Sequence, residues 1–584
     1  MKNKFKNYSL KVIYLVIVII ILLVPSSTGL IKNENNFSVQ TIFDKETNEV
    51  FSKLSTISDI KITDVNGGMN LAITLKNKGN QDYRNMLIKV EIKHGLIFTP
   101  RINNYTIPLL SSEGSSNTYT FQTQILGFGL GLITEKPHIS IVINEDDKEL
   151  VIGTIEARII GFKVKVLNSI LNEENIYQGY NLFTPEYTKN TCLVNNKGEI
   201  IHQWNGKYIQ GMDVALLENG NIIRADSSYP PSPRLLAGGF TGHIGVYNQN
   251  GLCTWEFTYS NSDHCLHHAF EVLPNGNILM IAVEYRSAEE AIKSGRNPKK
   301  LKYERLCPDH IIEVKPTGSS GGEIVWEWHV WDHLIQDYDP DKDNYGKIRK
   351  HPELIDINYG KDNADLTHIN AIDYNEEFDQ ILLSVREFNE IWVIDHSTTT
   401  KEAANHSGGK YGNGGDLLYR WGNPAAYNAG TEDQQKLFAL HDASWIEEDC
   451  PGSGNILIFN NQVPLVDENN PNLRAYSSVV EIDPPVNVDG SYNKIGLKFG
   501  PITPVWTYTS DDVYDFYSSY LSSAQRLPNG NTLICEGNKG RFFEINMDKE
   551  IVWQYTNNYG IPNHVFKVHR YGSDYEGVKN LLEK

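Results

Sequence analysis

The sequence predicts an all-β protein in which a six-bladed β-propeller, residues 168–575, follows an immunoglobulin-like β-sandwich, residues 57–167. Two observations predict this fold class. A short strand that ends in Trp or Tyr recurs six times in the C-terminal two-thirds of the chain, and segments of alternating apolar and polar residues run through the part before it. The chain also contains 31 Tyr and 10 Trp, residue types that favour strands.

The first 29 residues have the pattern of an export signal. Four lysines near the N-terminus precede an apolar run, residues 12–24, and small and polar residues follow it at 25–29. This order is typical of a signal peptide, and the run is also hydrophobic enough to remain as an N-terminal membrane anchor. Both interpretations predict an exported protein, extracellular or in the cell envelope. Residues 30–56 are polar and mixed, and are expected to be a linker.

Residues 57–167 are predicted to form the sandwich because apolar and polar residues alternate in several short segments. The clearest of these segments are 59–63, 71–75 and 88–92, and residues 77–80, Asn-Lys-Gly-Asn, are expected to form a turn. This part of the chain resembles the immunoglobulin-like modules of secreted archaeal and bacterial proteins. No set of catalytic residue types converges in it, so it is expected to serve as a spacer or docking domain.

Three repeated elements predict the propeller. The first is the strand ending in Trp or Tyr, with copies at 198–204, 251–257, 322–328, 415–421, 501–508 and 549–555. The second is a strand before most of these copies, at 244–247, 311–314, 391–394, 479–482 and 542–545. The third is a hairpin with an Asn-Gly turn at 217–221, 273–277 and 527–531, with degenerate copies at 375–380 and 451–455. Three or four short strands repeated six times give blades, and residues 564–570 are expected to complete one blade.

The Asn-Gly turns are strong hairpin signals, because both turn residues are expected to have positive φ. The copies are irregularly spaced, so the additional residues are assigned to loops, notably 284–306, 328–366 and 401–414. Long loops on one face of such a fold commonly build a binding site.

The composition limits the class of partner. A formal net charge of −19 argues against nucleic acid, because phosphate binding needs a basic surface, while a locally positive pocket for a small anion remains compatible with it. The six cysteines include no C-x-x-C pair, which disfavours a zinc knuckle. Disulfides are compatible with export, and each cysteine fits equally well as a small buried side chain.

Three histidines and an arginine lie at the beginnings of predicted blades. His268 directly precedes the hairpin at 273–277, His368 and His441 precede the strands of two later blades, and Arg386 ends the hairpin after His368. Inner strands of a propeller converge on its axis, so these side chains are expected to meet there and form an anion site. A single histidine of this kind would be a structural hydrogen bonder, but the set at matching positions favours function.

At these residues the C-terminal region resembles the bacterial aryl sulfotransferase family, whose members transfer sulfuryl groups without a nucleotide sulfate donor. The resemblance extends over residues 175–572. The segments that carry it are 365–374, 380–386, 421–424, 440–444 and 524–531.

The resemblance implies a ping-pong reaction: a histidine takes the sulfuryl group from a phenolic sulfate ester, and a second phenol accepts it. His441 matches the nucleophile, since a neutral imidazole is nucleophilic near pH 7. His368 and Arg386 match the groups around the sulfuryl oxygens, and His268 matches a further histidine of the pocket. All four are therefore assigned to the catalytic set.

The resemblance further implies that Asn370 and His267 bind substrate. The chain departs from the family pattern at two positions: residue 269 is Ala where an acidic residue is expected, and residue 444 is Ser where many relatives carry an aromatic residue or His. No metal or other cofactor is expected. The expected partners are the phenolic sulfate donor, the phenol acceptor and, through the N-terminal segment, a membrane; a homodimer is also compatible with the resemblance.

Two other functions fit parts of the pattern. One is a non-catalytic extracellular propeller that binds an anionic ligand or a glycan. The other is a quinoprotein dehydrogenase, which also has a tryptophan-rich propeller. Quinoprotein dehydrogenases usually have eight blades and a calcium-binding set of carboxylates, and neither pattern is found in the sequence.

Overall fold

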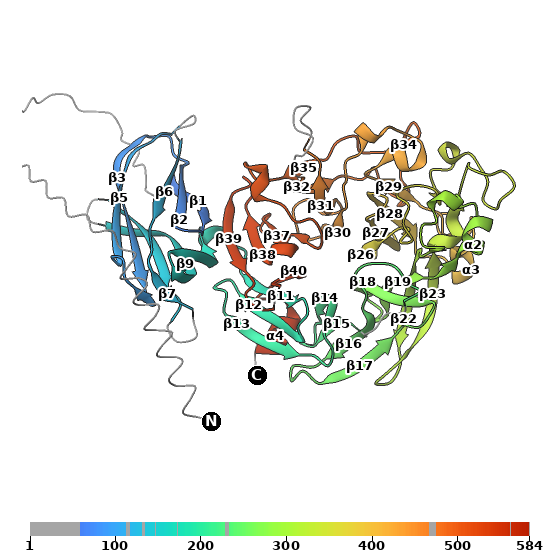
Figure 1. The fold of residues 1–584 in the computed structure, drawn as a ribbon, viewed down its shortest axis with the longest axis horizontal. Helices are drawn as coiled ribbons and strands as arrows, with labels where there is room; N and C mark the ends of the chain where they lie inside the picture. Colours follow the sequence, from blue (N-terminus) through green and yellow to red (C-terminus); the bar gives the residue numbers. More distant parts are fainter. Residues whose placement is uncertain are drawn as a thin grey trace, which may run out of the picture. The chain divides into compact units, whose positions relative to one another are not determined.

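The computed structural model describes residues 59–582, apart from 113–116, 131–134, 146–147, 172, 228–232, 466–474 and 561. The predicted export signal or anchor, 1–29, and the predicted linker, 30–56, lie outside the described residues. Within the described part, every helix is too short or too polar to cross a membrane. The described chain is nearly all β (Figure 1).

The N-terminal strands form two sheets that enclose a core of their own. One sheet contains β1 (Ile60–Asn66), β2 (Leu71–Asn77) and β6 (Thr118–Thr123). The other contains β5 (Ile102–Leu110), β3 (Tyr83–Lys93), β8 (His138–Glu145), β9 (Lys148–Gly161) and β10 (Lys163–Ile170), with β4 (Leu96–Ile97) and β7 (Gly127–Gly129) beside it. The alternation of apolar residues places one face of each strand in this core, as in β2, where every second side chain is buried. The predicted strands are thereby confirmed, while the immunoglobulin-like class stays a prediction.

Strand β10 connects this region to the C-terminal strands. It pairs with β9 along one edge and with β39 (Ile551–Thr556) along the other, so the predicted boundary at residues 167 and 168 falls inside a strand. Asn168 is opposite Tyr555 in this pairing.

Six four-stranded antiparallel units follow in the described chain. Their strands, each from inner to outer, are β40 (Val565–Gly572), β11 (Gly179–Pro185), β12 (Asn190–Asn195) and β13 (Ile200–Asn205); β14 (Gln210–Leu216), β15 (Ile222–Ser227), β16 (Gly242–Tyr247) and β17 (Cys253–Thr258); β18 (His264–Val272), β19 (Ile278–Glu284), β22 (Asp309–Pro316) and β23 (Gly322–His329); β26 (Ile369–Asn375), β27 (Gln380–Val385), β28 (Glu390–Asp395) and β29 (Tyr419–Trp421); β30 (His441–Trp445), β31 (Ile456–Val463), β32 (Tyr476–Ile482) and β35 (Trp506–Tyr508); β36 (Ser523–Arg526), β37 (Thr532–Glu536), β38 (Arg541–Ile545) and β39.

The inner strands contact one another in a closed ring. Going round, β14 contacts β18, then β26, β30, β36 and β40 follow, and β40 contacts β14 again. Figure 1 shows the units arranged around this ring. Strand β40 comes from the C-terminus and pairs with β11, which confirms the expectation that residues 564–570 complete a unit. The chain ends in the short helix α4 (Glu576–Leu582).

The repeated Trp and Tyr element forms the outermost strand of every unit. Its Trp204, Trp328 and Trp553 are fully buried, so the repeat supplies large side chains to the packing between units. Neighbouring units are also joined by buried ion pairs, Arg526 with Glu481 at 2.6 Å and Arg570 with Glu544.

The Asn-Gly hairpins differ from the predicted turn type. In these turns only the glycine has positive φ, for example 78° at Gly220 and 83° at Gly276. The Gly220 N–H donates to Leu217 O and the Leu217 N–H donates to Asn221 O, a wider connection in which the asparagine keeps an ordinary backbone conformation. The prediction that both turn residues have positive φ was therefore wrong, because the loop is longer than two residues.

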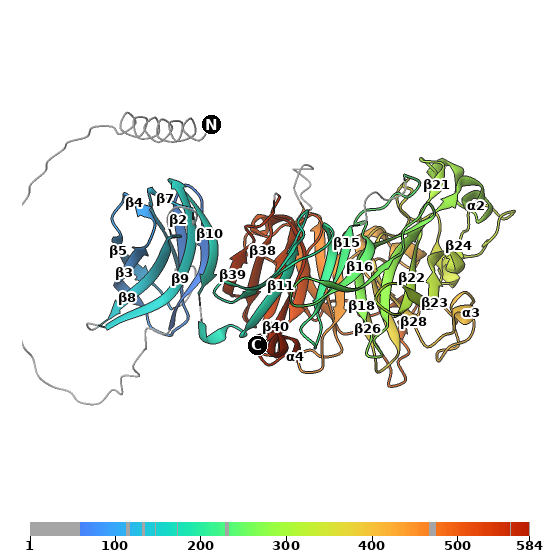
Figure 2. The same cartoon turned by 90° about the horizontal axis from the view of Figure 1, so that it is seen from below.

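The predicted long loops contain small elements of their own. These are β20 (Arg286–Ser287), α2 (Ala288–Lys293), β21 (Arg305–Leu306), β24 (Leu334–Ile335), β25 (Ile355–Asp356) and, at the start of the third loop, α3 (Thr400–Ala403). A further small hairpin, β33 (Lys494–Ile495) and β34 (Lys498–Phe499), lies outside the predicted loops. Figure 2 shows α2, β21 and β24 gathered beside β22 and β23. All six cysteines are free, and five of them are buried. They therefore match the expectation of small buried side chains rather than that of disulfides.

Candidate active site

Three imidazoles lie in, or directly before, three consecutive inner strands. His268 is in β18, His368 directly precedes β26, and His441 begins β30. The pairing register of each strand shifts beside its histidine, and bulges of this kind re-aim side chains. His268 and His368 have positive φ, 55° and 51°. Such conformations cost about 1–3 kcal/mol each in non-glycine residues and are concentrated at functional sites.

His268 and His368 face each other. Their ring centroids are 4.9 Å apart in an edge-to-face arrangement. Gly238 and Gly239 lie directly against the two rings: a Cβ atom on Gly239 would be 2.4 Å from Cε1 of His268, and one on Gly238 would be 2.8 Å from Cε1 of His368. This segment can approach the imidazoles so closely only because both residues lack a side chain.

His441 is held as a neutral imidazole. Its Nδ1 lies 2.8 Å from Asn461 Oδ1 and 3.2 Å from Ala439 O. Both partners are acceptors, so Nδ1 carries the proton and the lone pair is on Nε2. Burial, together with the positive charges of Arg386 and His368, lowers the pKa of His441 to about 3. The ring is therefore uncharged at neutral pH.

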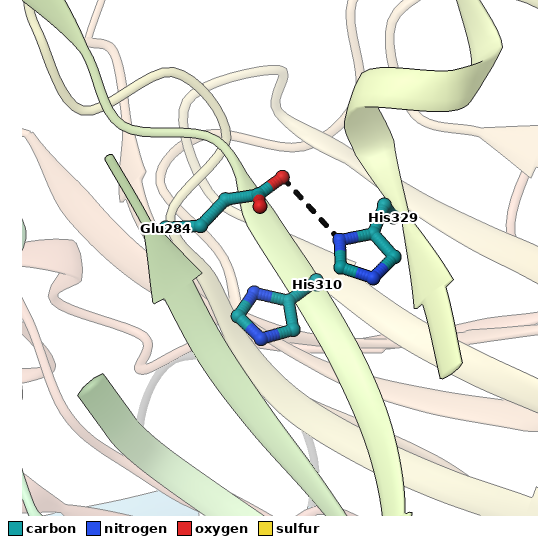
Figure 3. A group of neighbouring side chains, drawn as sticks. All are labelled: Glu284, His310 and His329. Atoms are coloured by element: carbon teal, nitrogen blue, oxygen red, sulfur yellow. Dashed lines mark hydrogen bonds and ion pairs between the residues drawn. The ribbon is translucent and has the colours of Figure 1, made fainter. Parts of the chain in front are cut away.

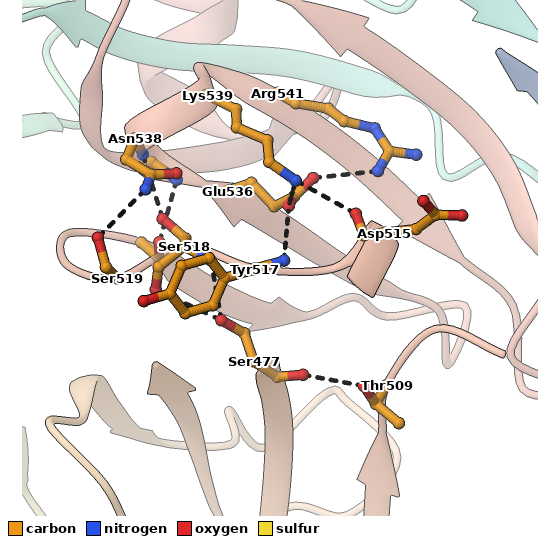
Figure 4. A network of polar contacts seen from close by, with 12 residues as sticks. Ser477, Thr509, Asp515, Tyr517, Ser518, Ser519, Glu536, Asn538, Lys539 and Arg541 are labelled. Atoms are coloured by element: carbon orange, nitrogen blue, oxygen red, sulfur yellow. Dashed lines mark hydrogen bonds and ion pairs between the residues drawn. The ribbon is translucent and has the colours of Figure 1, made fainter. Parts of the chain in front are cut away.

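A second layer of polar contacts fixes Asn461. Its Nδ2 donates to the carbonyl oxygens of Ser518 and Leu521, both at 2.9 Å, and the Ser477 hydroxyl donates to Asn461 O at 2.8 Å. Figure 4 shows how Ser477 and Ser518 continue into a network around the fully buried Glu536. The orientation of His441 thus depends on a chain of hydrogen bonds across two neighbouring units.

His368 is paired with a carboxylate. Its Nδ1 lies 2.6 Å from Asp365 Oδ2. Burial opposes the charged form of the ring, but the Asp365 carboxylate outweighs it and raises the pKa of His368 above its ordinary value. His368 is therefore the member of the group that most readily carries a proton.

His267 lies behind His268. Its Nδ1 is 2.8 Å from Nδ1 of His268, and its Nε2 is 3.0 Å from Asp309 Oδ1. Asp309 Oδ2 also accepts hydrogen bonds from the Thr367 hydroxyl and the Ile369 N–H, both at 2.6 Å. Nδ1 of His267 is thus engaged by His268, its Nε2 lies close to a carboxylate oxygen without forming a hydrogen bond to it, and the side chain is fully buried.

Asn370 and Arg386 complete the predicted set. Asn370 Nδ2 donates to Leu440 O at 2.8 Å, directly before His441, while its buried Oδ1 has no hydrogen-bond partner among the described residues. Arg386 pairs with Glu387, and its side chain is 26% exposed. Its charge lowers the pKa values of His268 and His441 and opposes the raised pKa of His368, which brings it into the same group.

The arrangement is a cluster of imidazoles beside Arg386, in which His268 and His441 are held neutral. Burial, followed by the charges of His368, His267, His441 and Arg386, lowers the pKa of His268 well below its ordinary value. Arg386 and a protonated His368 supply the positive charge here, each beside a carboxylate, Glu387 or Asp365, and a bound anion would interact with both of them. Groups of side chains with metal-ligand spacing occur elsewhere in the described chain and contain none of these imidazoles.

Residues 163–569 match the sequence model of the family described as Arylsulfotransferase (ASST). The chain belongs to the arylsulfotransferase family. No curated protein matches it significantly.

Solved structures that resemble this arylsulfotransferase are distant in sequence. A protein of unknown function from Bacteroides caccae is 12% identical, with a TM-score of 0.36, and the alignment covers 68% of this chain and 99% of that one. Virginiamycin B lyase from Staphylococcus aureus is 10% identical, with a TM-score of 0.32 and coverage of 68% and 89%. The Cps50 (Swd1) β-propeller domain of Myceliophteria thermophila is 8% identical, with a TM-score of 0.32 and coverage of 68% and 97%.

Three residues that contact the imidazole cluster were not foreseen from the sequence: Asp309, Asp365 and Asn461. Asp365 had a signal, because it lies three residues before His368 in a recognised segment. Asp309 and Asn461 had none, since each reaches its histidine from another strand, and strand pairing brings them together only in the folded chain.

The two departures from the family pattern fall in different surroundings. Ala269 is buried in the core, and Asp309 supplies a carboxylate beside the His267–His268 pair. Ser444 lines a cavity formed further along the inner strands.

Proposed function

We propose that the protein is an arylsulfate sulfotransferase that moves a sulfuryl group from a phenolic sulfate ester to a phenolic acceptor through a sulfohistidine on His441. The reaction would take place at the inner ring of a six-bladed β-propeller. The observation that carries the proposal is the environment of His441: its Nδ1 proton is held by Asn461 and Ala439, so the unprotonated Nε2 is available beside cationic groups.

In the first half-reaction, Nε2 of His441 attacks the sulfur of the donor ester. The S–N bond forms as the bond between sulfur and the aryl oxygen breaks, and the electron pair of that bond leaves on the phenolate. His368, which Asp365 keeps readily protonated, gives the phenolate its proton. The sulfuryl oxygens carry negative charge throughout, and Arg386 stabilises that charge.

In the second half-reaction, the acceptor phenol attacks the sulfur of the sulfohistidine. The S–O bond forms, the S–N bond breaks, and its electron pair returns to Nε2 of His441. The acceptor must lose its proton: His268 takes it and passes it back to His368, which lies beside it and has the higher pKa, so that both residues regain their starting states. If His267 directs its Nε2 proton to Asp309, its Nδ1 accepts from Nδ1 of His268, and this leaves the lone pair of His268 on Nε2. His267 thus acts by positioning His268.

The decisive experiment is to trap the intermediate. The enzyme is treated with 4-nitrophenyl sulfate in the absence of an acceptor, and its peptides are examined by mass spectrometry for an increase of about 80 Da, the mass of one SO₃ group. We expect the adduct on the peptide that contains His441, and release of the adduct when a phenol is added.

Two variants make the experiment specific. His441→Asn should form no adduct and transfer no sulfuryl group, whereas His202→Asn, which replaces an imidazole in the outer strand β13, should behave as wild type. An adduct on another peptide, or undiminished transfer by His441→Asn, would contradict the proposal. Binding of the sulfate ester without any turnover would favour the non-catalytic anion-binding alternative.

A further inference from the structure

A second group of imidazoles lies away from the inner ring, in the unit formed by β18, β19, β22 and β23. Glu284 ends β19, His310 lies near the start of β22, and His329 ends β23. Each side chain has one atom of metal-ligand type within 4.8 Å of those of the other two. Figure 3 shows the three side chains converging from neighbouring strands.

His310 has an unused ring nitrogen. The side chain is fully buried, and its Nε2 lies 3.2 Å from the hydroxyl of Tyr259. Its Nδ1 has no hydrogen-bond partner in the described chain. A buried polar atom without a partner is unfavourable, and each such atom in a native structure needs an explanation. In Figure 3 the unused nitrogen is on the side of the ring that faces the Glu284 carboxylate.

Glu284 offers one oxygen to the centre of the group. Its Oε1 lies 3.4 Å from Nδ1 of His329, and its Oε2 accepts a hydrogen bond from Arg286 at 2.9 Å. Arg286 therefore orients the carboxylate from behind and leaves Oε1 directed at the imidazoles. The hydrogen bond between His310 and Tyr259 orients that ring in the same way, as outer contacts do around bound metal ions.

We propose that Glu284, His310 and His329 bind a divalent transition-metal ion, with Zn²⁺ as the best-matched ion. Two imidazoles and one carboxylate are a common ligand set for zinc, which leaves a fourth position for solvent. The 3.4 Å between Glu284 and His329 equals the separation of about 3.4 Å expected for two ligands of a tetrahedral zinc ion.

Binding requires one local adjustment. The rings of His310 and His329 are stacked, with centroids 4.8 Å apart and planes inclined by 4°, so both lone pairs cannot point at one ion in this arrangement. His310 is buried and held by Tyr259, whereas the His329 side chain is 26% exposed. His329 is therefore the ring that turns, and the exposed side of the group admits the ion.

Two other groups of side chains in the described chain have potential ligand atoms at similar spacing, but the case for a metal site is weaker in both. In the group His333, His406 and Asp416, both imidazoles already bond to Asp416 at 2.8 Å, and the second nitrogen of His333 bonds to Ala403 O. In the third group, Glu447 and Asp449 are exposed and Cys450 is their neighbour. Only the first group combines three ligand atoms with a buried nitrogen that lacks a partner.

The test is zinc binding by the purified chain after chelator treatment, followed by competition with a metallochromic indicator. We expect about one Zn²⁺ per chain from this ligand set, together with a higher thermal unfolding midpoint when zinc is present. His310→Ala and Glu284→Gln should each weaken binding at least about tenfold, since each removes a direct ligand. His264→Ala, which removes a nearby imidazole outside the set, and His406→Ala, in the second group, should bind zinc as wild type does.

Three outcomes would overturn the proposal: no zinc binding by the wild-type chain, unchanged affinity in both ligand variants, or loss of binding in His406→Ala. Circular dichroism of the two ligand variants checks that the fold is kept, and Glu284→Gln changes no volume in the core. Sulfuryl transfer measured on the same preparations should stay at the wild-type level, because the group shares no residue with the pocket around His441. Failure of zinc binding is thus distinguishable from failure of the proposed transferase function.

Discussion

Basic side chains lie towards one end of the inner strands, and mostly acidic side chains lie towards the other. The basic end supplies His268, His368 and His441. Further along the same ring of strands, the chain forms a cavity of about 1050 Å³, whose lining includes eight carboxylates and three cationic side chains. The carboxylates are Asp213, Glu218, Glu271, Asp373, Asp442, Glu447, Asp449 and Asp574, and the cations are Lys567, Arg526 and Arg570. The change of sign takes place within a few residues of each strand, and in β30 it occurs between His441 and the next residue.

The carboxylates that line the cavity repel one another, and burial disfavours their charged forms. Burial, followed by the charge of Asp373, raises the pKa of Glu271 to about 8, and burial raises the pKa of Asp373 to about 6. Lys567 partly offsets the repulsion through an ion pair with Asp442 at 3.0 Å. A sulfate ester would be attracted by the imidazole pocket and repelled by the cavity, so the contrast gives the ring one end suited to anions.

The largest loss of activity is expected when the fixed positive charge beside the imidazoles, that of Arg386, is removed. Arg386→Gln should lower sulfuryl transfer from 4-nitrophenyl sulfate by about 10²–10³-fold, as the loss of one charge-stabilising donor does in other enzymes. Arg386→Lys should recover part of the activity, because it keeps the charge without the planar fork. Steady-state kinetics measure both, with Arg101→Gln in the N-terminal sheets as the control. Equal activity in the three variants would remove Arg386 from the site.

A smaller effect on the rate is expected when Asp365, which favours the protonated form of His368, is replaced. Asp365 raises the pKa of His368, so transfer that needs protonated His368 is lost as the pH rises through that raised pKa. Asp365→Asn removes the carboxylate, and the alkaline limb of the pH–rate profile should move down by roughly 1–3 pH units. Above neutral pH the rate should fall about tenfold or more. An alkaline limb in the same place would contradict the assigned role of His368.

Asp309 should affect one half-reaction only. Its carboxylate positions His267, which positions His268, and His268 is proposed to act when the acceptor phenol gives up its proton. Asp309→Asn should slow the transfer from sulfohistidine to phenol by about tenfold and leave the initial burst of nitrophenol at its wild-type rate. Rapid-mixing kinetics separate the two phases. A purely structural role would slow both, which would exclude the positioning role.

The two ends of the ring were not equally accessible to sequence reasoning. The outer strands could be predicted because a turn followed by Trp or Tyr recurs at each of them, and the histidines because they precede recognisable hairpins. Asp309 and Asn461 could not, since their contacts with His267 and His441 join strands whose alignment depends on bulges. Register shifts of one or two residues have no pattern in a single sequence.

The cavity escaped prediction for a different reason. Asp213, Glu271 and Asp373 are isolated acidic residues in otherwise mostly apolar strand segments, and acidic side chains in strands usually face solvent. In an inner strand of a closed ring, both faces and one edge are enclosed, so a polar residue there is directed into the interior. Ser444 lines the same cavity.

The smallest change in activity, and the clearest test of the acidic side, is expected for Glu271→Gln. The pKa of Glu271 is raised to about 8 from an ordinary value of 4.5, so the folded state favours the protonated form. Wild type should therefore lose stability as the pH rises from about 4.5 to 8, by at most about 1.4 kcal/mol per pH unit for this one proton. In Glu271→Gln the dependence of stability on pH should flatten, because the neutral amide has no proton to lose. Sulfuryl transfer should stay within about twofold of wild type, since Glu271 is not one of the residues assigned to the reaction.

Denaturant unfolding at several pH values measures the dependence of stability on pH. If the variant keeps the wild-type slope, the carboxylates do not repel one another in the folded protein, and the electrostatic contrast between the two ends loses its acidic half.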